Sequence, residues 1–170
     1  MNKHLIFLLV GIISCLFVHA QHHIKSWAGK YSGELVIYKP DGNVAQTVSM
    51  VLDIGPTADS TVWTWKTTYN KNDVRDYVVL IKDASKGKYV LDEKNGILID
   101  LRFFGNKILS CFDVEGYLIY DSHTLVGNEI IFELSSSSEE QATRSGGKDE
   151  IPKVKSMHQV TYQRAVLKRQ

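Results

Sequence analysis

Aromatic side chains alternate along one short stretch of the chain, and this stretch has the pattern of a binding wall. Trp63, Trp65 and Tyr69 fall on one face of a predicted strand over residues 61–69, because successive side chains of a strand point to opposite faces. If this face points into the protein, its rings can stack against a flat or apolar ligand. Filling of a hydrophobic core by bulky residues explains the same pattern equally directly.

The next predicted strand, residues 74–82, adds polar groups to the same region. Arg75 and Tyr77 share one face of it. An inward Arg75 would lie beside the aromatic wall and anchor a carboxylate, whereas an outward Arg75 is an ordinary surface charge. The candidate ligand-binding residues are therefore Trp63, Trp65, Tyr69, Arg75 and Tyr77.

Known catalytic patterns are missing from the sequence. It contains no Gly-x-Ser-x-Gly elbow, no His-Glu-x-x-His pair and no phosphate-binding glycine loop. His123 lies near a predicted strand end, with nothing at a metal-ligand spacing. Cleavage before Gln21 would place His23 third in the mature chain, where a Cu(II) or Ni(II) site is conceivable but not favoured. We expect a non-enzymatic protein without metal or cofactor.

The first twenty residues have the anatomy of a secretory signal peptide. Lys3 precedes an apolar run of about 14 residues, Leu5 to Val18, and Val18 and Ala20 supply small residues at the −3 and −1 positions. The run is too short for a comfortable transmembrane helix, for which about 20 residues are needed. We therefore expect residues 1–20 to be removed and the mature protein to be secreted or periplasmic.

A lipoprotein interpretation of the same segment stays open. Residues 12–15, Ile-Ile-Ser-Cys, resemble a lipobox, which would anchor the chain at the cell envelope through lipidated Cys15. The apolar run continues past Cys15, and this favours ordinary cleavage.

Composition and charge narrow the class of protein. The net charge of +1 over 170 residues gives no basic surface for nucleic acid or membrane. Residues 21–170 suit one domain. Once the leader is removed, Cys111 is the only cysteine, so no intrachain disulfide forms. Because Cys111 lies in a strand-like run, we expect it to be buried as a small apolar residue.

The remaining chain reads as β-strands separated by tight turns. Residues 40–42, Pro-Asp-Gly, and residues 95–96, Asn-Gly, are strong turn signals. About ten strands follow one another, and short connections favour antiparallel neighbours. Closure removes exposed sheet edges, so an antiparallel up-and-down β-barrel of about 8–10 strands is favoured over a two-sheet sandwich. Residues 22–28 are predicted to form at most a short helical turn.

One segment breaks this pattern. Residues 135–150 contain four consecutive serines, a Gly-Gly pair and almost no apolar side chains. Such a composition buries too little surface to offset the entropy of ordering. We expect a flexible loop over residues 135–150.

The start of the mature chain resembles a known family. Trp27-x-Gly29-x-Tyr31-x-Gly33 is similar to the entry of lipocalin-like, calycin-type barrels. The resemblance implies that Trp27 packs across the closed end of the barrel beneath an arginine from the last strand, for which Arg164 is the candidate. The expected strand number is closer to the fatty-acid-binding and nitrobindin-like branches, so His158 is a candidate haem ligand if it points inward. A partly exposed histidine is the favoured interpretation.

The sequence thus leads to two main expectations of function. The first is a secreted or periplasmic, lipocalin-like protein that binds a small, mostly apolar ligand inside its barrel. The alternative is an extracytoplasmic interaction module with a packed barrel, whose partner would bind loops such as residues 135–150. An enzyme ranks third, and neither a nucleic-acid partner nor a membrane span is expected.

Overall fold

The computed structural model describes residues 24–170. The predicted signal peptide, the lipobox at Cys15 and the histidines at positions 22 and 23 lie outside the described residues. Within them, no helix is long and apolar enough to cross a membrane.

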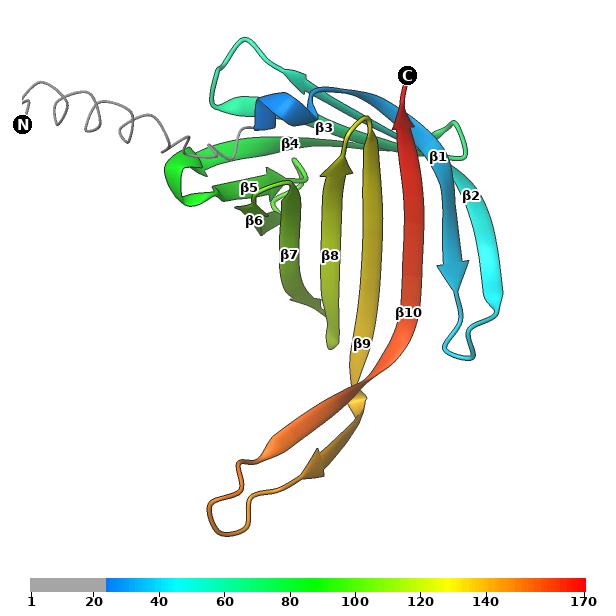
Figure 1. Ribbon diagram of the computed structural model, residues 1–170, viewed down its shortest axis with the longest axis vertical. Helices are drawn as coiled ribbons and strands as arrows, with labels where there is room; N and C mark the ends of the chain where they lie inside the picture. The colour runs from blue at the N-terminus through cyan, green and yellow to red at the C-terminus, as the bar shows by residue number, and fades with distance from the viewer. Residues whose placement is uncertain (1–23) are drawn as a thin grey trace, which may run out of the picture.

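Ten antiparallel strands close into one barrel (Figure 1). Each strand pairs with the next along the chain, and the last pairs with the first, which confirms the up-and-down, lipocalin-like barrel. The strands are β1 (Gly29–Tyr38), β2 (Val44–Pro56), β3 (Val62–Tyr69), β4 (Asp73–Asp83), β5 (Lys88–Asp92), β6 (Leu98–Phe104), β7 (Lys107–Val114), β8 (Tyr117–Val126), β9 (Glu129–Ser145) and β10 (Val154–Arg169). Two short 3₁₀ helices, η1 (Ile24–Trp27) and η2 (Ala84–Lys86), complete the fold.

The turn signals of the sequence act as expected. Gly42 has φ +83° and Gly96 has φ +100°, conformations that cost glycine little. Asp41 fixes the first of these turns, because its carboxylate accepts a hydrogen bond of 2.9 Å from the Asn43 N–H. Tight turns of this kind keep consecutive strands adjacent and so dictate the meander.

One end of the barrel is closed by η1. Trp27 is 1% exposed and meets the Phe103 ring edge-on, with ring centroids 5.9 Å apart. The Tyr31 hydroxyl donates a hydrogen bond of 3.1 Å to the Trp27 carbonyl. The closing position predicted for Trp27 from the family resemblance agrees with this geometry.

The arginine at the closed end is Arg169 and not Arg164. The Arg169 guanidinium donates to the carbonyls of Ala28 at 2.8 Å and Ser26 at 3.2 Å. Arg164 lies opposite Val36 and Glu133, earlier in β10 and further from the closed end, and is exposed. The two arginines are five positions apart in β10, so the side chain of Arg164 belongs to a different level of the barrel.

Close approach of two strands explains one glycine near the start of β1. A Cβ atom on Gly33 would lie 2.3 Å from the Val166 carbonyl oxygen of β10. Only glycine lets the first and last strands meet at this distance. Gly33 therefore contributes to closure of the barrel.

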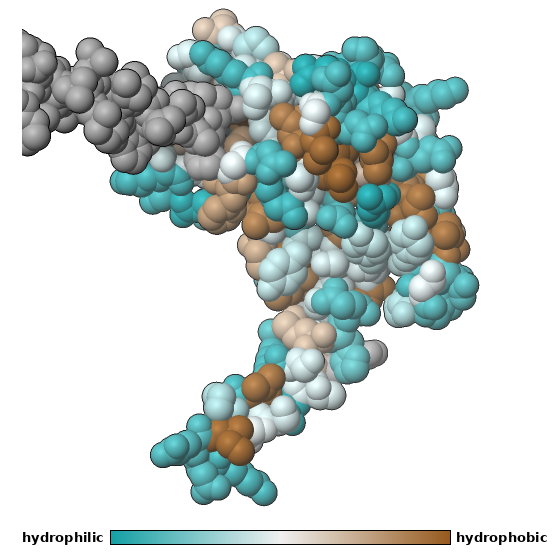
Figure 2. All heavy atoms as spheres, viewed as in Figure 1, coloured by the Kyte–Doolittle hydropathy of each residue, from teal (hydrophilic) through white to brown (hydrophobic). Residues whose placement is uncertain are grey.

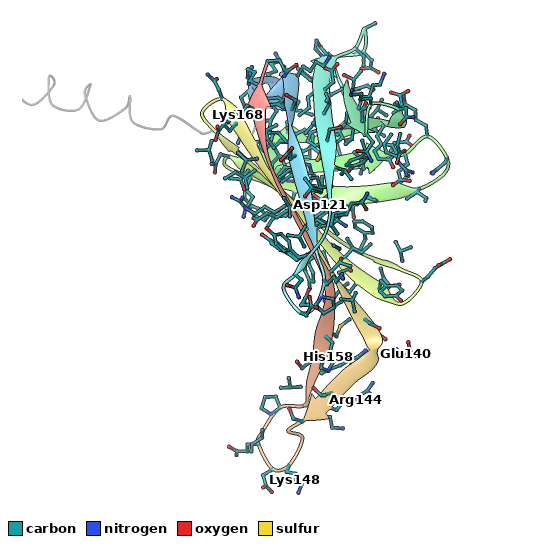
Figure 3. The ribbon with its side chains drawn as sticks, turned by 90° about the vertical axis from the view of Figure 1, so that its right-hand side faces the viewer. Asp121, Glu140, Arg144, Lys148, His158 and Lys168 are labelled. Atoms are coloured by element: carbon teal, nitrogen blue, oxygen red, sulfur yellow. The ribbon has the colours of Figure 1, made fainter. Side chains whose placement is uncertain are left out.

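The β9–β10 hairpin continues well beyond the barrel as a two-stranded ribbon, here called the arm (residues 139–157; Figures 1 and 3). Ser138 is the last residue of β9 that also pairs with β8. Figure 3 shows Glu140, Arg144 and Lys148 far from Asp121, which lies in the barrel. The surface of the arm is largely hydrophilic (Figure 2).

The loop predicted over residues 135–150 is therefore mostly strand. Residues 135–138 pair with both β8 and β10, and Ser137 is only 2% exposed. Serine hydroxyls substitute for apolar contacts here: Ser136 Oγ lies 2.8 Å from Thr161 Oγ1, and Ser137 Oγ accepts 2.8 Å from the Gln159 amide. Composition alone missed this, because backbone ladders do not depend on apolar side chains.

Cys111 is exposed, contrary to the prediction. In β7, Ile108 and Ser110 point into the barrel and are buried, so Cys111 points out. Strand propensity identified the element but not the face.

Candidate functional site: a polar and aromatic cavity at the open end

The interior of the barrel holds a cavity of about 180 Å³ towards the end opposite η1. Hairpin turns, together with the arm, surround this open end. Most of the lining is apolar or aromatic, and a polar group converges from each of several strands. The lining residues are Met50, Trp65, Thr67, Tyr69, Tyr77, Leu91, Glu93, Ile99, Leu101, Ile108, Ser110, Phe112, Asp121, His123, Phe132 and Leu134.

Three of the five predicted ligand-binding residues line this cavity: Trp65, Tyr69 and Tyr77. Their register brings them together, because Trp65 of β3 lies directly opposite Tyr77 of β4. Trp63 points inward too and is 6% exposed, but it packs in the core nearer the closed end. The aromatic face of β3 thus serves both as core and as cavity wall.

Arg75 lies at the rim instead of within the cavity. Its side chain is 53% exposed and forms an ion pair with Asp73, with Nε 3.2 Å from Oδ1. A second contact, Nη2 to Oδ2 at 3.3 Å, makes the pair bidentate. The charge of Arg75 is thereby matched by its neighbour.

Two tyrosine hydroxyls experience the charges of the site. Burial raises the pKa of Tyr69 to about 12, and the nearby Asp121 carboxylate adds to the increase. Burial likewise raises the pKa of Tyr77, with a further contribution from Glu93. Both hydroxyls are therefore protonated at neutral pH and can donate or accept hydrogen bonds.

Asp121 and His123 form the most polar part of the wall. His123 Nδ1 lies 3.0 Å from Asp121 Oδ1, and the His123 side chain is 9% exposed. The imidazole packs edge-on against Trp65, with ring centroids 5.1 Å apart. It is tilted by 48° against the Phe132 ring, with centroids 4.9 Å apart. Sequence reasoning set His123 aside, although its alternation with Asp121 on β8 would have placed both side chains on one face.

Two buried hydroxyls face the cavity. Thr67 is 6% exposed and Ser110 is 8% exposed, and both line it. Within residues 24–170, neither hydroxyl has a hydrogen-bond partner, yet no polar side-chain atom is sealed away without one. These hydroxyls therefore point to the open space of the cavity, where they can bind water or a polar ligand group.

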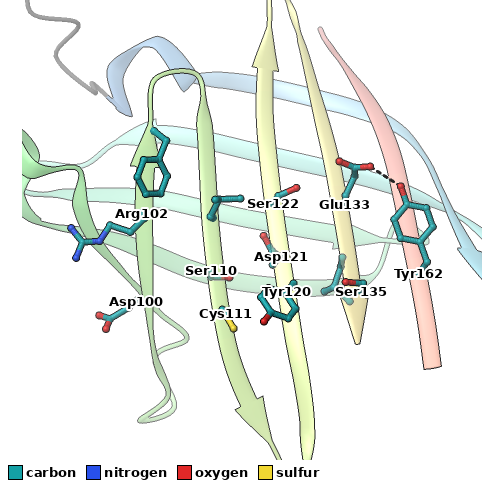
Figure 4. A pocket seen from close by; sticks show the side chains of 13 residues that line it. Asp100, Arg102, Ser110, Cys111, Tyr120, Asp121, Ser122, Glu133, Ser135 and Tyr162 are labelled. Atoms are coloured by element: carbon teal, nitrogen blue, oxygen red, sulfur yellow. Dashed lines mark hydrogen bonds between the residues drawn. The ribbon is translucent and has the colours of Figure 1, made fainter. Parts of the chain in front are cut away.

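A larger hollow of about 530 Å³ lies along the barrel wall (Figure 4). Outward side chains of β6 to β10 form most of it, including Arg102, Cys111, Tyr120 and Glu133. Ser110, Asp121 and Leu134 line both this hollow and the cavity. The Tyr162 hydroxyl donates to Glu133 at 2.6 Å, so these two groups satisfy each other. Because its side chains are mainly outward and exposed, this groove encloses a ligand less than the cavity does.

His158 points away from the cavity. It is exposed and lies next to the base of the arm, where it pairs with Ser138 (Figure 3), so an inward haem ligand at this position is not supported by the structure. Among the described residues, no three His, Cys, Asp or Glu side chains gather closely enough to hold a metal ion.

Solved structures share this fold at very low sequence identity. A protein of unknown function from the DUF3598 family of Nostoc punctiforme PCC 73102 superimposes with a TM-score of 0.64 at 12% identity, over 87% of this chain and 49% of that protein. The chain thus spans about half the length of that relative. The S-type phycobiliprotein lyase CPES from Guillardia theta matches with a TM-score of 0.54 at 8% identity, over 91% of this chain and 97% of the lyase. No family model and no curated protein sequence matches the chain.

Proposed function

We propose that this protein is a lipocalin-like carrier or sensor that binds a small, mostly apolar ligand bearing one polar group in the open end of its barrel. The observation that carries the proposal is the cavity inside the barrel, with its aromatic wall and the two buried hydroxyls of Thr67 and Ser110. Apolar pockets with a few convergent polar groups are the usual form of ligand sites.

The size of the cavity limits the ligand. A volume of about 180 Å³ is smaller than the roughly 300–1,000 Å³ of most drug-sized sites. The ligand is therefore a small molecule, or one end of a longer molecule that extends through the mouth. Burial of about 100 Å² of apolar ligand surface contributes about 2.5 kcal/mol, so a ligand confined to the cavity binds at millimolar concentration. A longer ligand that extends through the mouth buries more surface and can be retained through purification.

Comparison with known structures supports binding in general terms. One neighbour carries the name phycobiliprotein lyase, and its fold covers almost the same length. We propose binding as the role of this chain and place it outside the cytoplasm, on the grounds of the apolar leader and its Val18–Ala20 cleavage pattern.

A matched pair of substitutions tests where the ligand binds. Thr67→Leu fills the cavity from β3, because Thr67 lines the cavity and not the outer groove, whereas Ser122→Leu adds the same side chain to the outer groove from β8. Native mass spectrometry of protein purified from its own host should show a retained small molecule in the wild type and in Ser122→Leu, and none in Thr67→Leu. Thermal unfolding confirms that each variant is folded. Retention of the ligand by Thr67→Leu and its loss from Ser122→Leu would assign it to the outer groove.

A second candidate function rests on the arm. Ile151 and Val154 are 61% and 50% exposed near its tip, which is unusual for a segment held away from the barrel. Capture of a partner protein that is lost on removal of the arm, together with an empty cavity in native mass spectra, would favour an interaction module.

A further inference from the structure

The charges around the cavity are unequal, and this inequality narrows the chemistry of the ligand. Glu93 and Asp121 both line the cavity. Arg75, the cation at the rim, is already bound in bidentate fashion by Asp73. Lys94 is engaged by Asp76, with Nζ 2.9 Å from Oδ2. Carboxylates therefore face the cavity while these neighbouring cations are occupied by other partners.

Glu93 has only a weak neutral partner. Its carboxylate accepts a hydrogen bond of 3.2 Å from the Asn95 amide. Within residues 24–170, no Lys, Arg or His nitrogen lies within ion-pair distance of Glu93. Because it is partly buried at the mouth, Glu93 adds negative potential along the path into the cavity.

Asp121 and Ser110 form a polar pair deeper in the cavity. The two residues are direct partners in the β7–β8 register, and both side chains point inward. Directly opposed residues have Cβ atoms about 5 Å apart, so one ligand group can reach both side chains. His123 Nδ1 lies 3.0 Å from one oxygen of the Asp121 carboxylate, and the carboxylate offers about four acceptor sites. The remaining sites, with the unpartnered hydroxyl of Ser110, await a hydrogen-bond donor.

Aromatic rings complete the surroundings of this pair. Trp65, Tyr69 and Phe132 line the cavity together with Asp121. The faces of aromatic rings attract cations, most strongly where water is excluded. A carboxylate beside such rings suits an ammonium group attached to an apolar body.

We propose that the cavity binds a small apolar or aromatic amine, whose ammonium group donates to Asp121 and to the Ser110 hydroxyl while Glu93 attracts it to the mouth. This inference rests on the proposed function, because it specifies the ligand class of the same cavity. It replaces the carboxylate ligand that an inward Arg75 would have favoured.

Three ligands with the same ring and a two-carbon chain that ends in a different polar group test the proposal: phenethylamine, 2-phenylethanol and phenylacetate, titrated by NMR and calorimetry at pH 7.5. Charge-assisted hydrogen bonds favour the amine over the alcohol by about tenfold or more. Asp121→Asn should abolish this preference and leave binding of the alcohol within about twofold, because the amide keeps the size of the side chain.

Control variants distinguish the effect of a carboxylate inside the cavity from the effect of the net charge of the protein. Asp113→Asn removes an exposed carboxylate from the outer face of β7, also towards the open end, and should leave the amine preference unchanged. Glu93→Gln should weaken amine binding less than Asp121→Asn does, and it serves as the second test if Asp121→Asn unfolds. Thr67→Val is a further isosteric control for loss of a cavity hydroxyl.

Each remaining outcome decides the question. Equal binding of amine and alcohol would overturn the amine assignment and leave the cavity as a ligand site. Tightest binding of phenylacetate would overturn it in favour of Arg75. Failure of all three ligands to bind in the cavity at millimolar concentration would overturn both this inference and the proposed function.

Discussion

The guanidinium of Arg169 lies over the ring of Tyr31, with its central carbon 4.9 Å from the ring centroid. The same side chain also hydrogen-bonds the Tyr31 hydroxyl and two carbonyls of the segment that carries Trp27. Residues 138 positions apart are thereby joined at the closed end. The last residues of β10 thus hold the plug formed by η1 in place.

Replacement of Arg169 should loosen this end. We expect Arg169→Ala to lower the free energy of unfolding by about 1–3 kcal/mol, because the carbonyl acceptors lose charge-assisted bonds and the ring loses its cation. Urea unfolding followed by tryptophan fluorescence measures the change. Arg164→Ala is the matched control, since Arg164 is exposed on the same strand. A larger loss for Arg164→Ala than for Arg169→Ala would return the closing role to Arg164.

Tyr69 should make the protein sensitive to alkali. Its folded pKa of about 12 lies above the ordinary value of 10, so the unfolded chain loses this proton first as the pH rises. The contribution is complete below about pH 10 and is lost towards pH 12, on the order of 1–2 kcal/mol.

Tyr69→Phe should therefore flatten the decline of stability between pH 10 and 12, as measured by urea unfolding at fixed salt. Tyr117→Phe, which changes an exposed tyrosine of the β7–β8 hairpin, is the control. An identical decline in wild type and Tyr69→Phe would show that folding does not raise the pKa of the Tyr69 hydroxyl.

The thiol of Cys111 should react in the folded protein. It is exposed in the outer groove near Tyr120, with no disulfide partner among the described residues. We expect complete alkylation at Cys111 under native conditions, at a rate close to that in denaturant, as followed by peptide mass spectrometry. Reaction only after unfolding would show that the Cys111 thiol is less exposed than the structure indicates.

Removal of the arm should spare the barrel. No residue of the hydrophobic core lies between positions 139 and 157. Replacement of residues 140–156 by a short turn should therefore change the free energy of unfolding by no more than about 0.5 kcal/mol. Retention of the cavity ligand by the shortened protein would separate the binding site from the arm, whereas loss of the ligand would make the arm part of the site.

Periodicity and turn chemistry were sufficient to predict the barrel. Alternation on β3 brought Trp65 and Tyr69 to the correct face, and the Asn-Gly and Pro-Asp-Gly turns set the meander. The arm escaped prediction because pairing between two backbones leaves little trace in composition. Cys111 was misplaced because a strand offers two faces, and only the assembled barrel decides which of them is inside.

The site was predictable in part, for a similar reason. An aromatic wall is visible within one strand, whereas the Ser110–Asp121 pair arises from the register between two strands. Arg75 shows the converse problem. Its face agrees with that of Tyr77, but its position at the rim and its ion pair with Asp73 depend on tertiary structure.

The ladder between β6 and β7 has consequences for movement. Only Arg102–Leu109, Phe103–Ile108 and Phe104–Lys107 are paired there, all near the closed end, while β7 and β8 stay paired along their whole length. The β6–β7 ladder is consequently missing from the half of β7 nearer the open end, and Ser110 is the first residue beyond the last pair, Arg102–Leu109. We expect amide hydrogen exchange to be fastest along this line. A ligand too broad for the open end would then enter between β6 and β7, and the rest of the barrel would stay folded.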